Sequence, residues 1–212
     1  MLYYSITYAA LFAGIIPLIV LFLKKRAFVV SDSIQPFVWL TFIATLYEGI
    51  GTFILKVNTT YWFQIYSLLE FLTIYYFFYK LLRSSYKKVF TISFIVLLTT
   101  YILSFYFWKE YQSLVANAIN KIAITLFVFF FSYIWFKQLF QKMEIPNLLK
   151  DSNFYFVSGL AIYYSSTSFL FLLSCFIFEN RVYLFDIWLV NIIATLILRT
   201  CLIIGVWNMK RV

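Results

Sequence analysis

The chain has 212 residues, of which 64% are hydrophobic, 24% are aromatic and only 12% are charged. Soluble domains carry roughly twice that share of charged residues, so the composition excludes a water-soluble protein and predicts a chain embedded in lipid. The net charge of +9 does not indicate nucleic-acid binding, because no segment is left for a soluble domain that could present a basic face.

Apolar runs of about twenty residues, the length that crosses a bilayer core, follow one another along the chain. Seven such runs cover residues 2–23, 34–55, 61–82, 89–108, 114–136, 154–178 and 183–207. We therefore predict an all-α fold, a polytopic membrane bundle of seven transmembrane helices that forms a single domain over residues 1–212.

The distribution of basic residues predicts the orientation of this bundle, because loops rich in Lys and Arg stay in the cytoplasm. The loops and span ends of one side carry twelve such residues: Lys24, Lys25, Arg26, Lys80, Arg83, Lys87, Lys88, Lys137, Lys142, Lys150, Lys210 and Arg211. Loops on the other side carry three, Lys56, Lys109 and Arg181. We expect an external N-terminus and a cytoplasmic C-terminus in a plasma membrane, namely a bacterial inner membrane.

The segment between the fifth and sixth runs, Lys137 to Asn153, mixes apolar and charged residues. This pattern is typical of an interfacial helix on the inner leaflet. Such a helix would offer a contact surface to a cytoplasmic or membrane protein partner. A plain amphipathic connector is the alternative.

The residue types exclude several kinds of chemistry. The chain contains no histidine, which removes Ser-His-Asp catalysis and histidine-based metal sites. Its two cysteines are too few for a zinc or iron-sulfur site, and its five glycines form no phosphate-binding motif. We expect no catalytic residue, no metal and no cofactor.

Four ionisable residues lie inside the predicted spans and away from their ends: Glu48, Glu70, Lys121 and Arg199. Each costs roughly 2.5 to 3.5 kcal/mol if it is left unpaired in hydrocarbon. At a rise of about 1.5 Å per residue, the first three lie at a similar depth below the outer ends of their spans, and Arg199 lies deeper.

Other polar residues recur three or four positions away from these charges and so share a helix face with them. We therefore predict a polar cavity in the outer half of the bundle. Its expected ligand-binding residues are Glu48, Glu70, Asn117, Asn120, Lys121, Tyr164, Asn191 and Arg199. The alternative is that the two bases only neutralise the two acids and that the polar residues form hydrogen bonds between helices.

Three functions are compatible with such a cavity. The first is a module that binds a small polar ligand and signals to a partner. The second is a proton-coupled transporter or channel, for which the Gly49-Ile50-Gly51 segment beside Glu48 could supply the interrupted helix that transporters use. The third is an intramembrane enzyme that acts on lipid, with Glu48 or Glu70 as a general base.

Two aromatic segments carry a family resemblance. They are NTTYWFQIYSLLEFLTIYYFFYKLL, with Tyr66 and Glu70, and NFYFVSGLAIYYSSTSFLFLL, with Gly159, Tyr163 and Tyr164. Together they resemble a family of uncharacterised bacterial seven-helix membrane proteins, some of them encoded beside sensor histidine kinases. The resemblance implies at most a signalling or operon-partner setting.

Overall fold

A computed structural model describes residues 2–29, 32–57, 60–82, 86–108, 113–142, 147–173 and 184–210. Within these ranges the secondary structure is helical, and no strand occurs. The main helices are α1 (Leu2–Leu23), α2 (Gln35–Leu46), η1 (Tyr47–Ile54), α3 (Thr60–Leu82), α4 (Lys87–Ser104), α5 (Ser113–Lys142), α6 (Ser152–Leu172) and α8 (Leu184–Asn208). Two short 3₁₀ turns, η2 (Phe105–Phe107) and η3 (Leu148–Lys150), follow α4 and precede α6.

Among the described residues, 6 helices are long and apolar enough to cross a membrane: α1, α3, α4, α5, α6 and α8. The prediction of an all-helical fold is therefore confirmed, and the length and composition of these helices are compatible with a chain embedded in a membrane. The predicted second span is also helical, but its α-helix changes to a π-helix at Tyr47, so it does not form one long α-helix. Seven spans remain a prediction, and residues 174–178 and 183, at the edges of the last two predicted spans, lie outside the described residues.

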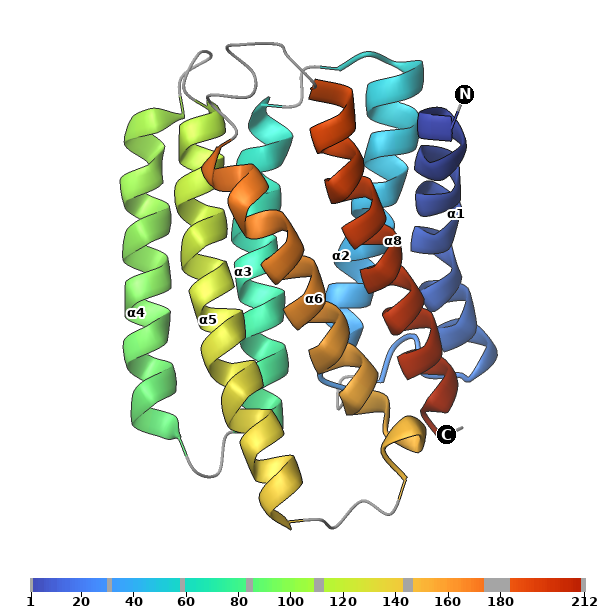
Figure 1. Ribbon diagram of the computed structural model, residues 1–212, viewed down its shortest axis with the longest axis vertical. Helices are drawn as coiled ribbons and strands as arrows, with labels where there is room; N and C mark the ends of the chain where they lie inside the picture. The colour runs from blue at the N-terminus through green and yellow to red at the C-terminus, as the bar shows by residue number, and fades with distance from the viewer. Residues whose placement is uncertain are drawn as a thin grey trace.

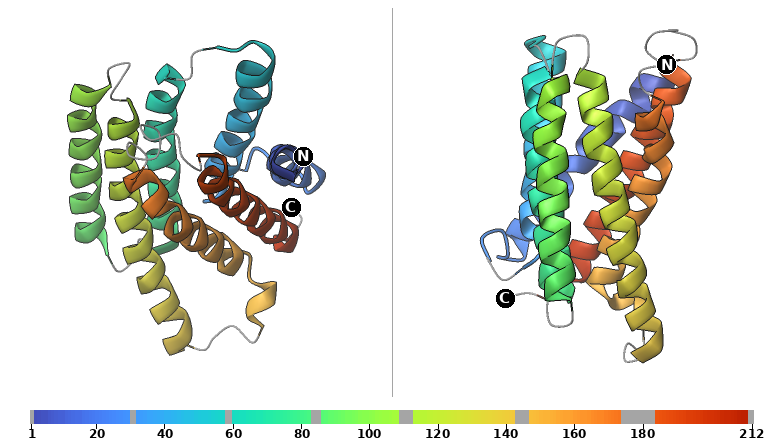
Figure 2. Two further views of the ribbon diagram at one scale, coloured as in Figure 1. Left: turned by 45° about the horizontal axis from the view of Figure 1, so that its top comes forward. Right: turned by 90° about the vertical axis from the view of Figure 1, so that its left-hand side faces the viewer.

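The helices run alternately up and down, and the two ends of the chain lie at opposite ends of the bundle (Figure 1). Helix α8 packs against both α6 and α1, while α5 packs against α3, α4 and α6. Helix α4 lies at one edge of the bundle and α1 at the other (Figures 1 and 2). This arrangement separates an α3–α4–α5 side from an α1–α2–α8 side.

The α3–α4–α5 side is filled by aromatic rings. Phe77, Phe78, Phe90 and Phe131 are fully buried there, and the rings of Phe90 and Phe131 stack with centroids 4.2 Å apart. Stacked and edge-to-face aromatic pairs pack densely and add to the stabilisation that burial provides.

Helices α6 and α8 approach each other closely because glycines line their contact. A Cβ atom on Gly159 would lie 2.6 Å from the Cβ of Cys201, and one on Gly205 would collide with the ring of Phe156. Small residues at a helix contact let two backbones come together in lipid, where packing rather than hydrophobic burial drives association. This contact fixes the position of α8, which carries Arg199.

The segment from Lys137 to Asn153 differs from the expected interfacial helix. Residues 137–142 continue α5, residues 143–146 lie outside the described part, and Leu148–Lys150 form a single 3₁₀ turn. Asp151 then caps α6 by accepting a hydrogen bond of 3.0 Å from the backbone N–H of Asn153. Aspartate is a favoured N-cap residue, which explains why α6 starts at Ser152.

Candidate functional site

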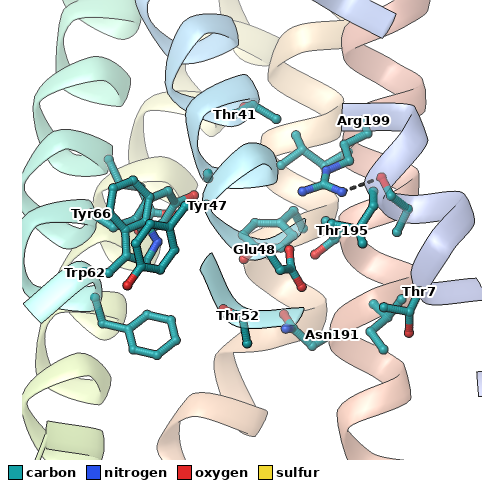
Figure 3. A pocket seen from close by; sticks show the side chains of 18 of the residues that line it. Thr7, Thr41, Tyr47, Glu48, Thr52, Trp62, Tyr66, Asn191, Thr195 and Arg199 are labelled. Carbon is teal, nitrogen blue, oxygen red and sulfur yellow. Dashed lines mark hydrogen bonds between the residues drawn. The ribbon is translucent and has the colours of Figure 1, made fainter. Parts of the chain in front are cut away.

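A cavity of about 360 Å³ lies between α1, α2, η1, α3 and α8, with one residue contributed by α6. It extends from Thr7 and Trp188, near the end of the bundle that holds the N-terminus, to Arg199. Its polar lining includes Thr7, Thr41, Glu48, Thr52, Asn191, Thr195 and Arg199, which Figure 3 labels, and also Glu70. A volume of this size lies within the range of small-molecule sites, roughly 300 to 1,000 Å³.

Helix α8 supplies one wall of the cavity. Asn191, Thr195 and Arg199 are four residues apart, so they lie on one face of the helix, and all three line the cavity. The Oδ1 atom of Asn191 is buried and has no hydrogen-bond partner within the described residues. The polar stripe that the sequence predicts on the last span therefore faces a hollow, and its amide oxygen lacks a protein donor.

Arg199 is held at the buried end of the cavity. Its side chain is only 6% exposed, and its Nη1 atom donates a hydrogen bond to the backbone carbonyl of Ala10 on α1. Its Nε atom is buried without a partner in the described part of the chain. Gly14 permits this position, because a Cβ atom there would lie 3.0 Å from the Cζ of Arg199 and would collide with the hydroxyl of Thr45.

Glu48 lies on the π-helix η1, where its side chain is exposed into the cavity. It has no hydrogen-bond or ion-pair partner among the described residues, and no nitrogen of Arg199 comes within 4.0 Å of its carboxylate. Gly49 and Gly51 follow Glu48, and glycine is the residue that departs from α-helical geometry most readily. π-Helices are rare and occur frequently at functional sites.

The rings of Tyr47, Trp62 and Tyr66 form the wall opposite α8. We call these three residues the aromatic wall. The rings of Tyr47 and Trp62 stack with centroids 4.3 Å apart, and Trp62 and Tyr66 follow at 5.9 Å. Figure 3 shows the carboxylate of Glu48 between the aromatic wall and the residues of α8.

A second group of polar residues, Glu70, Lys121 and Tyr164, lies beside the cavity. We call this group the ion-pair cluster. The Nζ atom of Lys121 lies 2.6 and 2.7 Å from the two carboxylate oxygens of Glu70, and the hydroxyl of Tyr164 donates to Oε1 at 2.8 Å. Glu70 and Tyr164 are 1% exposed and Lys121 is 5% exposed. Both carboxylate oxygens of Glu70 are therefore satisfied by protein donors.

Aromatic rings surround the ammonium group of this cluster. Its Nζ atom lies 5.2 to 5.6 Å from the ring centroids of Tyr66, Tyr163, Tyr164 and Phe171. Such distances are typical of cation–π contacts, which stabilise a desolvated cation. The carboxylate of Glu70 and these rings thus stabilise the ammonium group of Lys121 without a ligand.

The two asparagines expected in the cavity instead connect helices elsewhere. The hydroxyl of Ser67 on α3 lies 3.5 Å from Oδ1 of Asn117, and Nδ2 of Asn120 donates to the hydroxyl of Ser104 on α4 at 3.0 Å. These contacts join α5 to α3 and α4, as interhelical hydrogen bonds do in membrane bundles.

The residues that the sequence analysis grouped into one site therefore do not all line the cavity. Glu48, Glu70, Asn191 and Arg199 line the cavity, whereas Asn117, Asn120, Lys121 and Tyr164 do not. Helical spacing predicts which residues share a face, but it does not predict which neighbour that face meets.

The ligand-binding residues expected from the sequence include no member of the aromatic wall. The spacing of Trp62, Tyr66 and Glu70, four residues apart, was the available signal, because these three share one face of α3.

Comparison with protein-family models, with curated proteins and with solved structures gives no match for this chain. The resemblance to bacterial seven-helix membrane proteins consequently remains a prediction. Within the described residues, no group of three or more His, Cys, Asp or Glu side chains could hold a metal ion.

Proposed function

We propose that this protein is a seven-span protein of the bacterial inner membrane that binds a small polar ligand and signals its presence to a protein partner. The external N-terminus and the cytoplasmic C-terminus are part of this proposal. The partner would dock at the cytoplasmic end, which includes the segment from Lys137 to Asn153.

The distribution of charge at the two ends of the bundle supports this orientation. Because neighbouring helices alternate in direction (Figure 1), ten described basic residues belong to the end that holds the C-terminus: Lys24, Lys25, Arg26, Lys80, Lys87, Lys88, Lys137, Lys142, Lys150 and Lys210. Only Lys56 belongs to the opposite end among the described residues. Positive loops remain in the cytoplasm.

The observation that carries the ligand-binding proposal is the pair of uncompensated charges at the cavity. Arg199 has a protein acceptor for one nitrogen only, and Glu48 has no protein donor, within the described residues. A buried polar group such as the Nε atom of Arg199 is nearly always hydrogen-bonded, and charged residues inside membranes are functional by default. By contrast, the ion-pair cluster satisfies its own charges.

The proposal is tested by screening a library of small polar compounds against the purified protein in detergent and recording the temperature of unfolding. We expect at least one compound to raise this temperature for the wild type and to have a much weaker effect on Arg199→Gln. Thr99→Ala is the matched control, because the Thr99 hydroxyl is exposed on α4 and donates only to its own helix. A library without any stabilising compound would refute the proposal.

One observation favours a transporter as the second candidate. The α-helix of α2 gives way to the π-helix η1 at the cavity, next to Glu48. Transporters bind their substrates at interrupted helices. Uptake of the stabilising compound into proteoliposomes, driven by its own gradient or by a proton gradient, would identify a transporter, whereas binding without uptake would favour a sensor.

A further inference from the structure

We propose that the cavity recognises a zwitterion without net charge, whose anionic end binds Arg199 and whose ammonium group lies beside Glu48 and the aromatic wall. This inference rests on the ligand-binding function proposed above and specifies the chemical class of the ligand.

The balance of charge around the cavity favours a ligand with one positive and one negative group. The charged residues that line it are Glu48, Glu70 and Arg199. Lys121 already neutralises Glu70, so one negative and one positive charge remain. A ligand with a single charge would match one of them and leave the other uncompensated, which is costly in a medium of low polarity. A ligand that carries both charges matches both.

The separation of Glu48 and Arg199 also favours such a ligand. Opposite charges attract each other strongly when water is scarce, yet Glu48 and Arg199 do not approach within 4.0 Å. Two features of the backbone maintain the gap. Arg199 is bonded to the carbonyl of Ala10 and packs against Gly14, and Glu48 is placed by the π-helix. The fold thus keeps a positive and a negative group apart across a hollow.

The difference in exposure orients the ligand. Arg199 is 6% exposed and Glu48 is exposed, so the anionic group of the ligand occupies the buried end of the cavity. Its ammonium group then lies near the carboxylate of Glu48, in the space that the aromatic wall borders (Figure 3). Trp and Tyr faces attract cations within about 6 Å, so the aromatic wall adds to the binding of the ammonium group.

Two sources present this combination of groups: free amino acids, which carry a carboxylate and an ammonium group, and ethanolamine lipids, which carry a phosphate and an ammonium group. The shared chemistry is an anion and an ammonium group in one neutral molecule. The experiment below distinguishes the two sources.

The probes are the twenty common amino acids and glycerophosphoethanolamine, tested by thermal unfolding of the purified full chain. Each amino acid that raises the unfolding temperature is compared with the amine that lacks its carboxylate and with the acid that lacks its ammonium group. We expect both analogues to bind at least about tenfold more weakly, because each loses a charge-assisted hydrogen bond. In parallel, mass spectrometry of the purified protein measures retained phosphatidylethanolamine against phosphatidylglycerol.

Two variants test the charge assignment directly. Glu48→Gln leaves an excess positive charge at the cavity, so it should bind the acid analogue better than the amino acid. Arg199→Met leaves an excess negative charge and should prefer the amine. Because Glu48 is exposed, Glu48→Gln is expected to fold normally even if Arg199→Met does not. Thr99→Ala, outside the cavity, should keep the wild-type order.

The outcomes separate this inference from the function on which it rests. Stabilisation by amino acids, or selective retention of phosphatidylethanolamine that Glu48→Gln abolishes, supports the zwitterion and identifies its source. If singly charged or uncharged compounds bind the wild type as well as any zwitterion, the inference is wrong although ligand binding stands. If no compound of either library binds and neither lipid is retained selectively, both proposals are wrong.

Discussion

Removing one partner of the ion-pair cluster should destabilise the protein more than any other single substitution of a polar residue that we consider. Glu70 and Lys121 contact each other through both carboxylate oxygens at 2.6 and 2.7 Å, and both are almost completely buried. Glu70→Gln leaves the ammonium group of Lys121 without its counter-charge. Lys121→Met leaves the carboxylate of Glu70 with the Tyr164 hydroxyl as its one remaining donor among the described residues.

The size of the effect follows from this geometry. Leaving a buried charge without its partner costs about 3 to 5 kcal/mol. Tyr164→Phe removes one hydrogen bond to Glu70 but no charge, and a hydrogen bond between membrane helices contributes about 0.6 to 1.7 kcal/mol. The double variant Glu70→Gln/Lys121→Met carries neither charge. It should therefore be about as stable as the more stable single variant, which corresponds to a coupling free energy of about 3 kcal/mol.

The measurement is reversible unfolding in mixed micelles with increasing denaturing detergent, which yields a free energy of unfolding for the wild type, the two single variants and the double variant. Thr99→Ala again controls for nonspecific effects. Strictly additive losses, or single variants that lose less than about 1 kcal/mol, would show that the two residues do not depend on each other as their distances require.

Three further predictions concern packing and orientation. Gly159→Ala should lower the free energy of unfolding by about 1 to 3 kcal/mol, because its new methyl group would meet Cys201, whereas Gly49→Ala, whose Cβ atom would have no neighbour within 4 Å, should change it little. Gly14→Ala should weaken ligand binding by displacing Arg199 from α1, which a titration of unfolding temperature against ligand measures. The orientation is tested in a background without native cysteines, with Val57→Cys and Phe28→Cys, which are both exposed but lie at opposite ends of the bundle. In intact cells, Val57→Cys should react with a membrane-impermeant maleimide, whereas Phe28→Cys should react only after permeabilisation. The reverse pattern would overturn the proposed orientation.

The long apolar helices could be predicted from the sequence, because the length and composition that a membrane-spanning helix requires are simple to recognise. A helix that crosses a bilayer needs about twenty apolar residues, and such runs are visible without any knowledge of contacts. The boundaries of α1 and α3 match the predicted runs within one residue. The end of α5 does not, because residues 137–142 are amphipathic and continue the helix beyond its apolar part.

The candidate site could be predicted only in part. Asn191 and Arg199 share one helix face, and that face lines the cavity as the spacing implies. The partner of each charge could not be predicted, because the pairing of Glu70 with Lys121 depends on how α3 and α5 pack. The two glycines after Glu48 indicate an interrupted helix. Glycine alone does not indicate whether the interruption is a break or the π-helix that the structure contains.

The contrast between the two acids is the strongest reason to assign them different roles. Glu70 is almost completely buried and is bound by a lysine and a tyrosine hydroxyl, whereas Glu48 is exposed to the cavity and has no such partner among the described residues. A chain that required Arg199 merely to neutralise Glu48 could bring the two side chains together, since their attraction would favour contact. Instead, Gly14 makes room for Arg199 against α1, and a rare π-helix positions Glu48 away from it. Structural neutralisation accounts for the ion-pair cluster, and it does not account for the separated charges at the cavity.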